Sequence, residues 1–127
     1  SLDVLAIGYD PHNASAFLAD LEDFGCNLVE IKQSARSLND ATVEFQLEVK
    51  AHNVEYNRGN VLLTRSMHDA ILSPKNSFGE IKIDKMLQKN RIDPCDAVIC
   101  SHKISMGADL DTIDINDSVD AFLKLYE

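Results

Sequence analysis

A strand, helix and strand pattern fills the first 31 residues, and it constrains the fold more than any other feature. Residues 3–8 form a continuous apolar run, which predicts a short strand buried on both faces. Apolar side chains at helical spacing predict a helix over 14–24, capped by Asn13 and ended by Gly25. A second short strand is expected at 28–31. Such a βαβ unit requires parallel strands and a right-handed crossover, so the fold class is α/β.

A second helix is expected over 38–52. Ser37, with Asp40 three residues later, resembles a capping box, and apolar residues recur on one face of the helix that would follow. The tetrapeptide at 57–60, Asn-Arg-Gly-Asn, is typical of a turn.

An antiparallel hairpin and a further helix are expected next. Residues 67–73 and 79–84 both have the composition of strands, and the polar link between them suits a hairpin. Asp93 is predicted to cap a helix whose first turn contains Pro94 and which ends at Gly107.

Length and charge indicate one domain over 1–127, in which 108–127 form an acidic linker and a terminal helix. No apolar run is long enough for a membrane span, and no signal peptide precedes the domain. The net charge of −9 argues against DNA binding by phosphate neutralisation alone. A metal site, whose ions cancel part of that charge, remains compatible with it.

The three cysteines, Cys26, Cys95 and Cys100, are an odd number without framework spacing, which indicates reduced thiols of an intracellular protein. A zinc site built from Cys95, Cys100 and His102 lacks a fourth ligand and a C-x-x-C pair, so we reject it.

Two aspartates are the first candidates for a functional site. Asp10 follows the first predicted strand, at the end where ligands bind in parallel sheets, and Asp93 opens the predicted helix. Each precedes a proline, and Asp-Pro is also ordinary capping chemistry. If both lie on one rim of the sheet, their carboxylates repel, and Mg²⁺ or Mn²⁺ would relieve the repulsion.

Four further residues are weaker candidates. Asp96 lies one turn after Asp93 and can share its helix face as a third ligand. Asp69, on the predicted hairpin, is either a fourth ligand or a solvated strand residue. Lys85 and Arg91 precede the helix and could hold a phosphate, although such residues are more often only surface charges.

Other catalytic and nucleotide-binding patterns do not occur. The chain lacks both glycine-rich phosphate loops, the H-E-x-x-H zinc motif and the G-x-S-x-G nucleophile elbow. The cysteines also lack the local signatures of thiol enzymes.

Several short segments occur in a characteristic order: Gly8-Tyr9-Asp10-Pro11, Phe24-Gly25, Ile31-Lys32-Gln33, Ser37-Leu38-Asn39, Asn60-Val61-Leu62-Leu63, and Lys85 followed by Arg91-Ile92-Asp93 and Ala97. Through them, residues from Ile7 to about Met106 resemble the C-terminal nuclease domain of the tailed-phage terminase large subunit. Val61 replaces the usual proline of the family, and Asp69 stands where an asparagine is usual.

The resemblance implies a ribonuclease H-like fold, in which Asp10 and Asp93 hold two Mg²⁺ or Mn²⁺ ions for phosphodiester hydrolysis. It also implies cleavage of concatemeric double-stranded viral DNA during packaging, in the cytoplasm of the bacterial host. The implied partners are an N-terminal ATPase domain of the same protein, the terminase small subunit and the portal.

The family's first acidic strand should precede Asp10, yet only nine residues do so. We therefore expect a truncated domain without the first strands and the first catalytic acid, and isolated activity that is impaired. Strand 3–8 would then have an open edge and mediate self-association. Two alternatives stay open: another ribonuclease H-like nuclease, such as a resolvase, and a non-catalytic α/β interaction module in which the Asp-Pro pairs are only caps.

Overall fold

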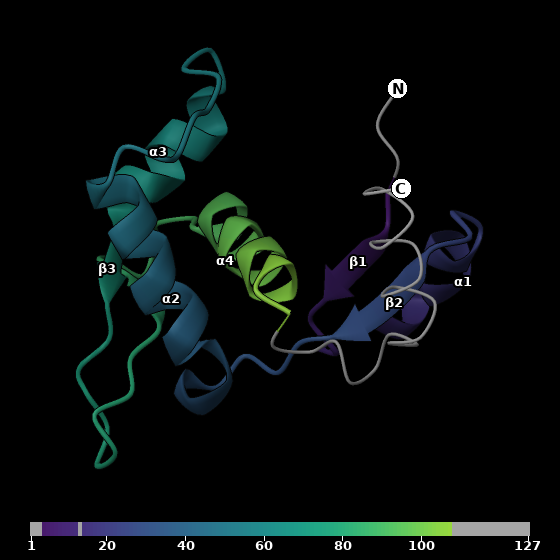
Figure 1. Ribbon diagram of the computed structural model, residues 1–127, viewed down its shortest axis with the longest axis horizontal. Helices are drawn as coiled ribbons and strands as arrows, with labels where there is room; N and C mark the ends of the chain where they lie inside the picture. The colour runs from purple at the N-terminus through teal and green to yellow at the C-terminus, as the bar shows by residue number, and fades with distance from the viewer. Residues whose placement is uncertain (1–3, 13, 108–127) are drawn as a thin grey trace, which may run out of the picture.

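The computed structural model describes residues 4–12 and 14–107, which form two small sheets and four α-helices. Helix α4 (Asp93–Ser105) lies in the middle, between a parallel sheet on one side and helices α2 and α3 on the other (Figure 1). The predicted cap Asn13 and the predicted acidic linker and last helix at 108–127 lie outside the described residues. None of the described helices is long and apolar enough to cross a membrane.

The first sheet pairs β1 (Ala6–Tyr9) with β2 (Asn27–Glu30) in parallel, in register from Ala6↔Asn27 to Tyr9↔Glu30. The predicted parallel βαβ unit is therefore confirmed. The prediction that the first strand is buried on both faces is wrong. The residues of β1 are only half-buried, and Leu5, just before it, is 81% exposed. Among the described residues only β2 pairs with β1, so the opposite edge of the strand has no neighbour.

The crossover between these strands is less regular than the expected single helix over 14–24. It consists of a 3₁₀ turn, η1 (Ala14–Ala16), and one short helix, α1 (Leu18–Glu22). No residue of α1 is buried, and Phe17 and Phe24 on either side are mostly exposed. Short helices depend on packing of an apolar face, and α1 has little surface to pack against. The helix ends at Glu22, two residues before the predicted end at 24, and Gly25 follows with a φ of +66°.

Helix α2 (Ala35–Lys50) begins three residues earlier than predicted. Its cap is Ser34, whose Oγ accepts a hydrogen bond from the backbone N–H of Ser37 at 3.2 Å. The expected capping box at Ser37 and Asp40 therefore lies inside the helix. The local pattern contains two serines three residues apart, and only the first has the extended backbone that a cap requires.

Helix α3 (Val61–Asp69) was not predicted. The Oδ1 of Asn60 caps it by accepting a hydrogen bond from the backbone N–H of Leu63 at 3.1 Å. The expected strand over 67–73 shrinks to β3 (Ala70–Leu72), so Asp69 ends a helix and is not a strand residue. β3 pairs antiparallel with β4 (Ile83–Lys85), which confirms the hairpin.

The helix predicted at Asp93 is confirmed as α4, with Pro94 in its first turn and Gly107, at φ +74°, after its end. Asp93 is its first residue and not its cap, because Ile92 occupies the cap position and no side chain bonds the first turn. The three cysteines are free thiols, as predicted, and only Cys95 is buried.

The core joins the parallel sheet to α2 and α4. Its buried side chains are Val29, Ile31, Leu38, Ala41 and Ile99. Gly8 lets α4 approach β1 closely, because a Cβ there would lie 2.5 Å from the terminal methyl groups of both Ile31 and Ile104. This close contact sets the position of the end of β1 relative to α4.

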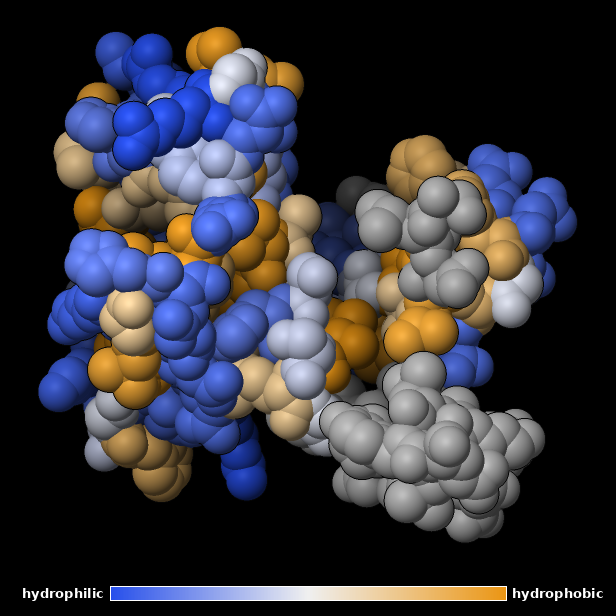
Figure 2. Space-filling view, turned by 45° about the horizontal axis from the view of Figure 1, so that its top comes forward, coloured by the Kyte–Doolittle hydropathy of each residue, from blue (hydrophilic) through white to orange (hydrophobic). Residues whose placement is uncertain are grey.

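Apolar side chains also reach the surface in several places, where they are orange in Figure 2. The largest exposed fractions among them belong to Phe78, at 86%, and Leu5, at 81%.

Candidate active site

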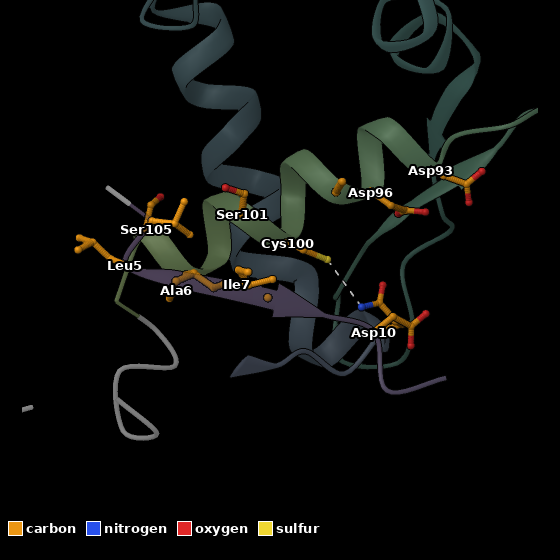
Figure 3. A pocket seen from close by; sticks show the side chains of 14 residues that line it. Leu5, Ala6, Ile7, Asp10, Asp93, Asp96, Cys100, Ser101 and Ser105 are labelled. Carbon is orange, nitrogen blue, oxygen red and sulfur yellow. Dashed lines mark hydrogen bonds between the residues drawn. The ribbon is translucent and has the colours of Figure 1, made fainter. Parts of the chain in front are cut away.

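Three of the predicted site residues come together in the structure. Asp10 follows β1, and Asp93 and Asp96 share the first turn of α4. All three line two adjoining depressions, one between β1 and α4 and one between α4 and the β3–β4 hairpin. Figure 3 shows the three side chains at the same end of the first depression. We call the second depression, of about 320 Å³, the carboxylate hollow.

The local backbone explains why Asp10 and Asp93 point into the same space. Parallel pairing with β2 fixes the direction of β1, and the contact of Gly8 with Ile104 holds α4 across it. The carboxylate of Asp10 accepts a hydrogen bond from the backbone N–H of His12 at 2.9 Å, which stabilises the turn after β1. This bond occupies Oδ1, and both Asp10 and Asp93 remain exposed to solvent.

The electrostatics of the hollow are unfavourable for three carboxylates alone. The pKa of Asp96 is raised to about 6, first by burial and then by the negative charges of Asp93, Asp10 and Asp84, against the opposing charge of Lys82. Both causes act on the charged form, because burial removes water from the carboxylate and the neighbouring carboxylates repel it. A cation in the hollow would relieve this repulsion.

Basic residues line the opposite wall of the carboxylate hollow. The predicted phosphate contacts Lys85 and Arg91 both line it, together with Lys82. The ammonium group of Lys82 donates a hydrogen bond to the backbone carbonyl of Gln33 at 3.0 Å, which ties the hairpin to the segment after β2. The hollow therefore has carboxylates from β1 and α4 on one wall and, on the other, these basic side chains together with the carboxylate of Asp84.

Lys82, Asp84, Gln33 and Asn90 also line the hollow, and the sequence reasoning missed them. Only its place in the sequence, one residue before the predicted contact Lys85, could have suggested Asp84. Gln33 follows β2 at the carboxyl end of the sheet and belongs to a segment that resembles the family, and either observation could have suggested it. Nothing local indicates Lys82, because its position depends on the hairpin packing against α2. There the backbone N–H of Ile81 donates to the side-chain oxygen of Asn39 at 2.9 Å, across 42 residues of sequence.

Asp69 does not join the other aspartates. Its carboxylate is bound by Arg65 at 3.1 Å, by Asn90 at 3.2 Å and by His68 at 3.4 Å. Partial burial would raise its pKa, but the hydrogen bonds from His68 and Arg65 outweigh that effect, so the pKa lies below its ordinary value. Asp69 lines a separate depression beside α3.

The donor set fits a hard divalent cation in chemistry, since carboxylate oxygens are the ligands that Mg²⁺ and Mn²⁺ prefer. It is incomplete in number. Within residues 4–12 and 14–107, no three acidic, histidine or cysteine side chains are grouped closely enough to hold one ion. A complete cation site therefore needs ligands from outside the described residues, or water and substrate oxygens.

Comparison with known proteins identifies the family. The family model for the endonuclease domain of the terminase large subunit matches residues 1–106. Among solved structures, the crystal structure of the HK97 bacteriophage large terminase matches 81% of this chain, with a TM-score of 0.68 and 24% sequence identity. The match covers 22% of that larger chain. A comparison with curated proteins finds no significant match.

The structural match confirms the predicted α/β, ribonuclease H-like fold class. The family match covers most of the sequence, so the resemblance seen in the sequence motifs is also confirmed. The chain belongs to the family of endonuclease domains of terminase large subunits.

Proposed function

We propose that this domain is a metal-dependent endonuclease that cleaves concatemeric viral DNA during packaging. The observation that carries the proposal is the meeting of Asp10 with Asp93 and Asp96 in one hollow, in a chain of the terminase endonuclease family. The raised pKa of Asp96 adds support. Burial and the neighbouring carboxylates destabilise the charged form of this group, and a bound cation would stabilise it.

In this proposal Asp10 and Asp93 are the catalytic ligands, and Asp96 is a further ligand. They would hold Mg²⁺ or Mn²⁺ in a two-metal site, together with ligands from outside the described residues. When bound, such ions supply Lewis acidity that activates water and stabilises the leaving oxygen. Asp69 has no part in the proposal, because its carboxylate is engaged by Arg65 and Asn90 elsewhere.

Lys85, Arg91 and Lys82 would bind the DNA backbone on the opposite wall. The three basic residues line the hollow that the aspartates share. A phosphate bound by these residues would therefore lie beside the carboxylates. The fixed bond from Lys82 to the carbonyl of Gln33 keeps that wall in place before DNA arrives.

The wider context follows from the family and stays part of the proposal. The substrate is double-stranded viral DNA, and an ATPase domain of the same protein would move it. The terminase small subunit and the portal would complete the packaging assembly, in the cytoplasm of the bacterial host.

Two measurements on the same variants test this function. The first is nicking of supercoiled plasmid with Mn²⁺, which Asp93→Asn should abolish and the matched Asp20→Asn, on α1 away from the hollow, should not. The second is thermal unfolding, in which Mn²⁺ at ten times its Kd should stabilise the wild-type fold by about 1.4 kcal/mol. This second readout does not depend on cleavage by the isolated chain. Equal behaviour of wild type and Asp93→Asn in both measurements would contradict the proposal.

A further inference from the structure

The loop that joins β3 to β4 is held in one shape by Asn76. The side-chain oxygen of Asn76 accepts hydrogen bonds from the backbone N–H groups of Phe78, at 3.0 Å, and Glu80, at 2.9 Å. Its amide nitrogen donates to the carboxylate of Glu80 at 3.0 Å. Gly79 closes the loop with a φ of +74° and a hydrogen bond to the carbonyl of Asn76. The tip of the hairpin, residues 75–80, is therefore held in one conformation by its own hydrogen bonds.

The arms of the hairpin are fixed as well. Ser73 and Lys82 exchange hydrogen bonds of 2.8 Å and 3.1 Å across the two arms. Ile81 is buried, and its backbone N–H bonds Asn39 on α2. Figure 1 shows the loop between β3 and β4 projecting beyond the N-terminal end of α2. Hydrogen bonds between its arms and to α2 therefore hold the hairpin in place, and its loop projects from the rest of the domain.

This projection carries Phe78 with 86% of its surface exposed, more than any other large apolar side chain in the described residues. Lys75 is exposed in the same loop. A fold gains nothing from holding an aromatic ring in water, so an ordered loop that does so is suited to contact a partner. Preorganisation of the loop lowers the entropy cost of such a contact.

Charge indicates which partner fits. Residues 57–91 carry seven basic and three acidic side chains, a net charge of +4 within a chain of net charge −9. The basic residues of this segment are Arg58, Arg65, Lys75, Lys82, Lys85, Lys89 and Arg91. A basic segment in an acidic chain, with Lys75 exposed in the same loop as Phe78, favours a polyanion over an ordinary protein surface.

The hairpin also connects the tip to the candidate active site. Lys82 lines the carboxylate hollow, and Phe78 precedes it by four residues on the same arm. Four residues of extended chain span at most roughly 13 Å. That span is comparable to the width of a DNA major groove, about 12 Å. One duplex can therefore lie over the hollow and touch the tip.

We propose that the hairpin tip is a second DNA contact, in which Phe78 packs against the bases in a groove and Lys75 binds a flanking phosphate of the duplex positioned over the carboxylate hollow. The inference rests on the proposed function for the identity of the substrate. Apolar side chains that press against base steps are an established way to hold or bend duplex DNA. The tip would position the duplex and take no part in the hydrolysis.

The test is binding of a fluorescently labelled duplex by anisotropy, in EDTA, so that binding is read without cleavage. Phe78→Ala should weaken the affinity about tenfold. Lys75→Ala should weaken it too and reduce the slope of log K against log salt by about 0.9. Phe17→Ala, an exposed phenylalanine beside α1, is the matched control and should bind as the wild type does. Unchanged unfolding temperatures would show that all three variants are folded.

Two results would overturn the inference. One is the absence of duplex binding by the wild-type chain. The other is wild-type affinity and salt dependence in both Phe78→Ala and Lys75→Ala, which would leave the tip as a contact for something other than DNA. Loss of affinity in these variants, together with cleavage that is indifferent to Asp93→Asn, would support the tip contact and reject the proposed function.

Discussion

The two walls of the carboxylate hollow are built in opposite ways. The acidic wall comes from β1 and α4, whose positions depend on the core and on the close contact at Gly8. The basic wall comes from β4 and the segment before α4, where long-range hydrogen bonds such as that from Lys82 to Gln33 add to the packing of Ile83 on the edge of the core. The difference in charge suggests a division of work, in which the acidic wall would hold cations and the basic wall would hold phosphate.

The largest expected effect comes from removing the basic wall. The double variant Lys85→Ala/Arg91→Ala should lower duplex affinity roughly tenfold or more at low salt, because two phosphate contacts are lost. The slope of log K against log salt should fall by about 1.8. Anisotropy titrations over a range of salt concentrations measure both quantities.

The control is Lys50→Ala, which removes a basic residue from the last turn of α2. It should leave the salt slope unchanged. An equal loss of affinity in the control and in the double variant would mean that only overall charge matters, and the two walls would no longer differ.

A smaller effect is expected from Gly8→Ala, which pushes β1 and α4 apart. The new methyl group would lie 2.5 Å from the terminal carbons of Ile31 and Ile104, and Ile31 is fully buried, so its side chain has little room to turn away. We expect a loss of about 1–2 kcal/mol in the free energy of unfolding. Urea denaturation measures it, and a variant as stable as the wild type would show that the acidic wall is not tightly packed.

The sequence predicts the acidic wall better than the basic one, for a physical reason. The βαβ unit and the helix at Asp93 depend on local apolar spacing and on Asp-Pro, which a sequence displays directly. Asn60 ends the predicted turn over 57–60 and also caps α3. The sequence pattern indicates the turn, but it does not indicate that a helix follows. The positions of Lys82 and Asp84 depend on the contact of Ile81 with Asn39, which no local pattern encodes.

The free-energy cost of a charged Asp96 in the acidic wall can be measured with Asp96→Asn. The pKa of Asp96 in the folded protein is about 6, above its ordinary value of 3.8, so the folded state binds more protons between these pH values. Stability should therefore fall as the pH rises from about 4 to 6. Because Asp96 is partly exposed, solvent screening limits the effect to on the order of 1 kcal/mol.

The asparagine variant should be more stable than the wild type at pH 7 and about equally stable below pH 4. Urea denaturation of both proteins at the two pH values gives the comparison. A stability difference that is the same at both pH values would contradict the account of the charges in the hollow.

The smallest expected effect concerns the open edge of β1. Leu5 is 81% exposed beside a strand that pairs only with β2 among the described residues, and such an edge tends to pair with another chain. We expect weak self-association that increases with salt, since the net charge of −9 opposes it. Sedimentation over a concentration series measures it, with Leu5→Lys expected to reduce it. A monomer at every concentration would contradict the expectation.

The most direct test of the central claim is a double-mutant cycle on Mn²⁺ affinity, measured by calorimetry for the wild type, Asp10→Asn, Asp93→Asn and the double variant. If both carboxylates hold the same cation site, each single variant should lose nearly as much affinity as the double variant does. Losses that simply add, or an affinity that neither substitution changes, would show that the two aspartates serve only the turn after β1 and the start of α4.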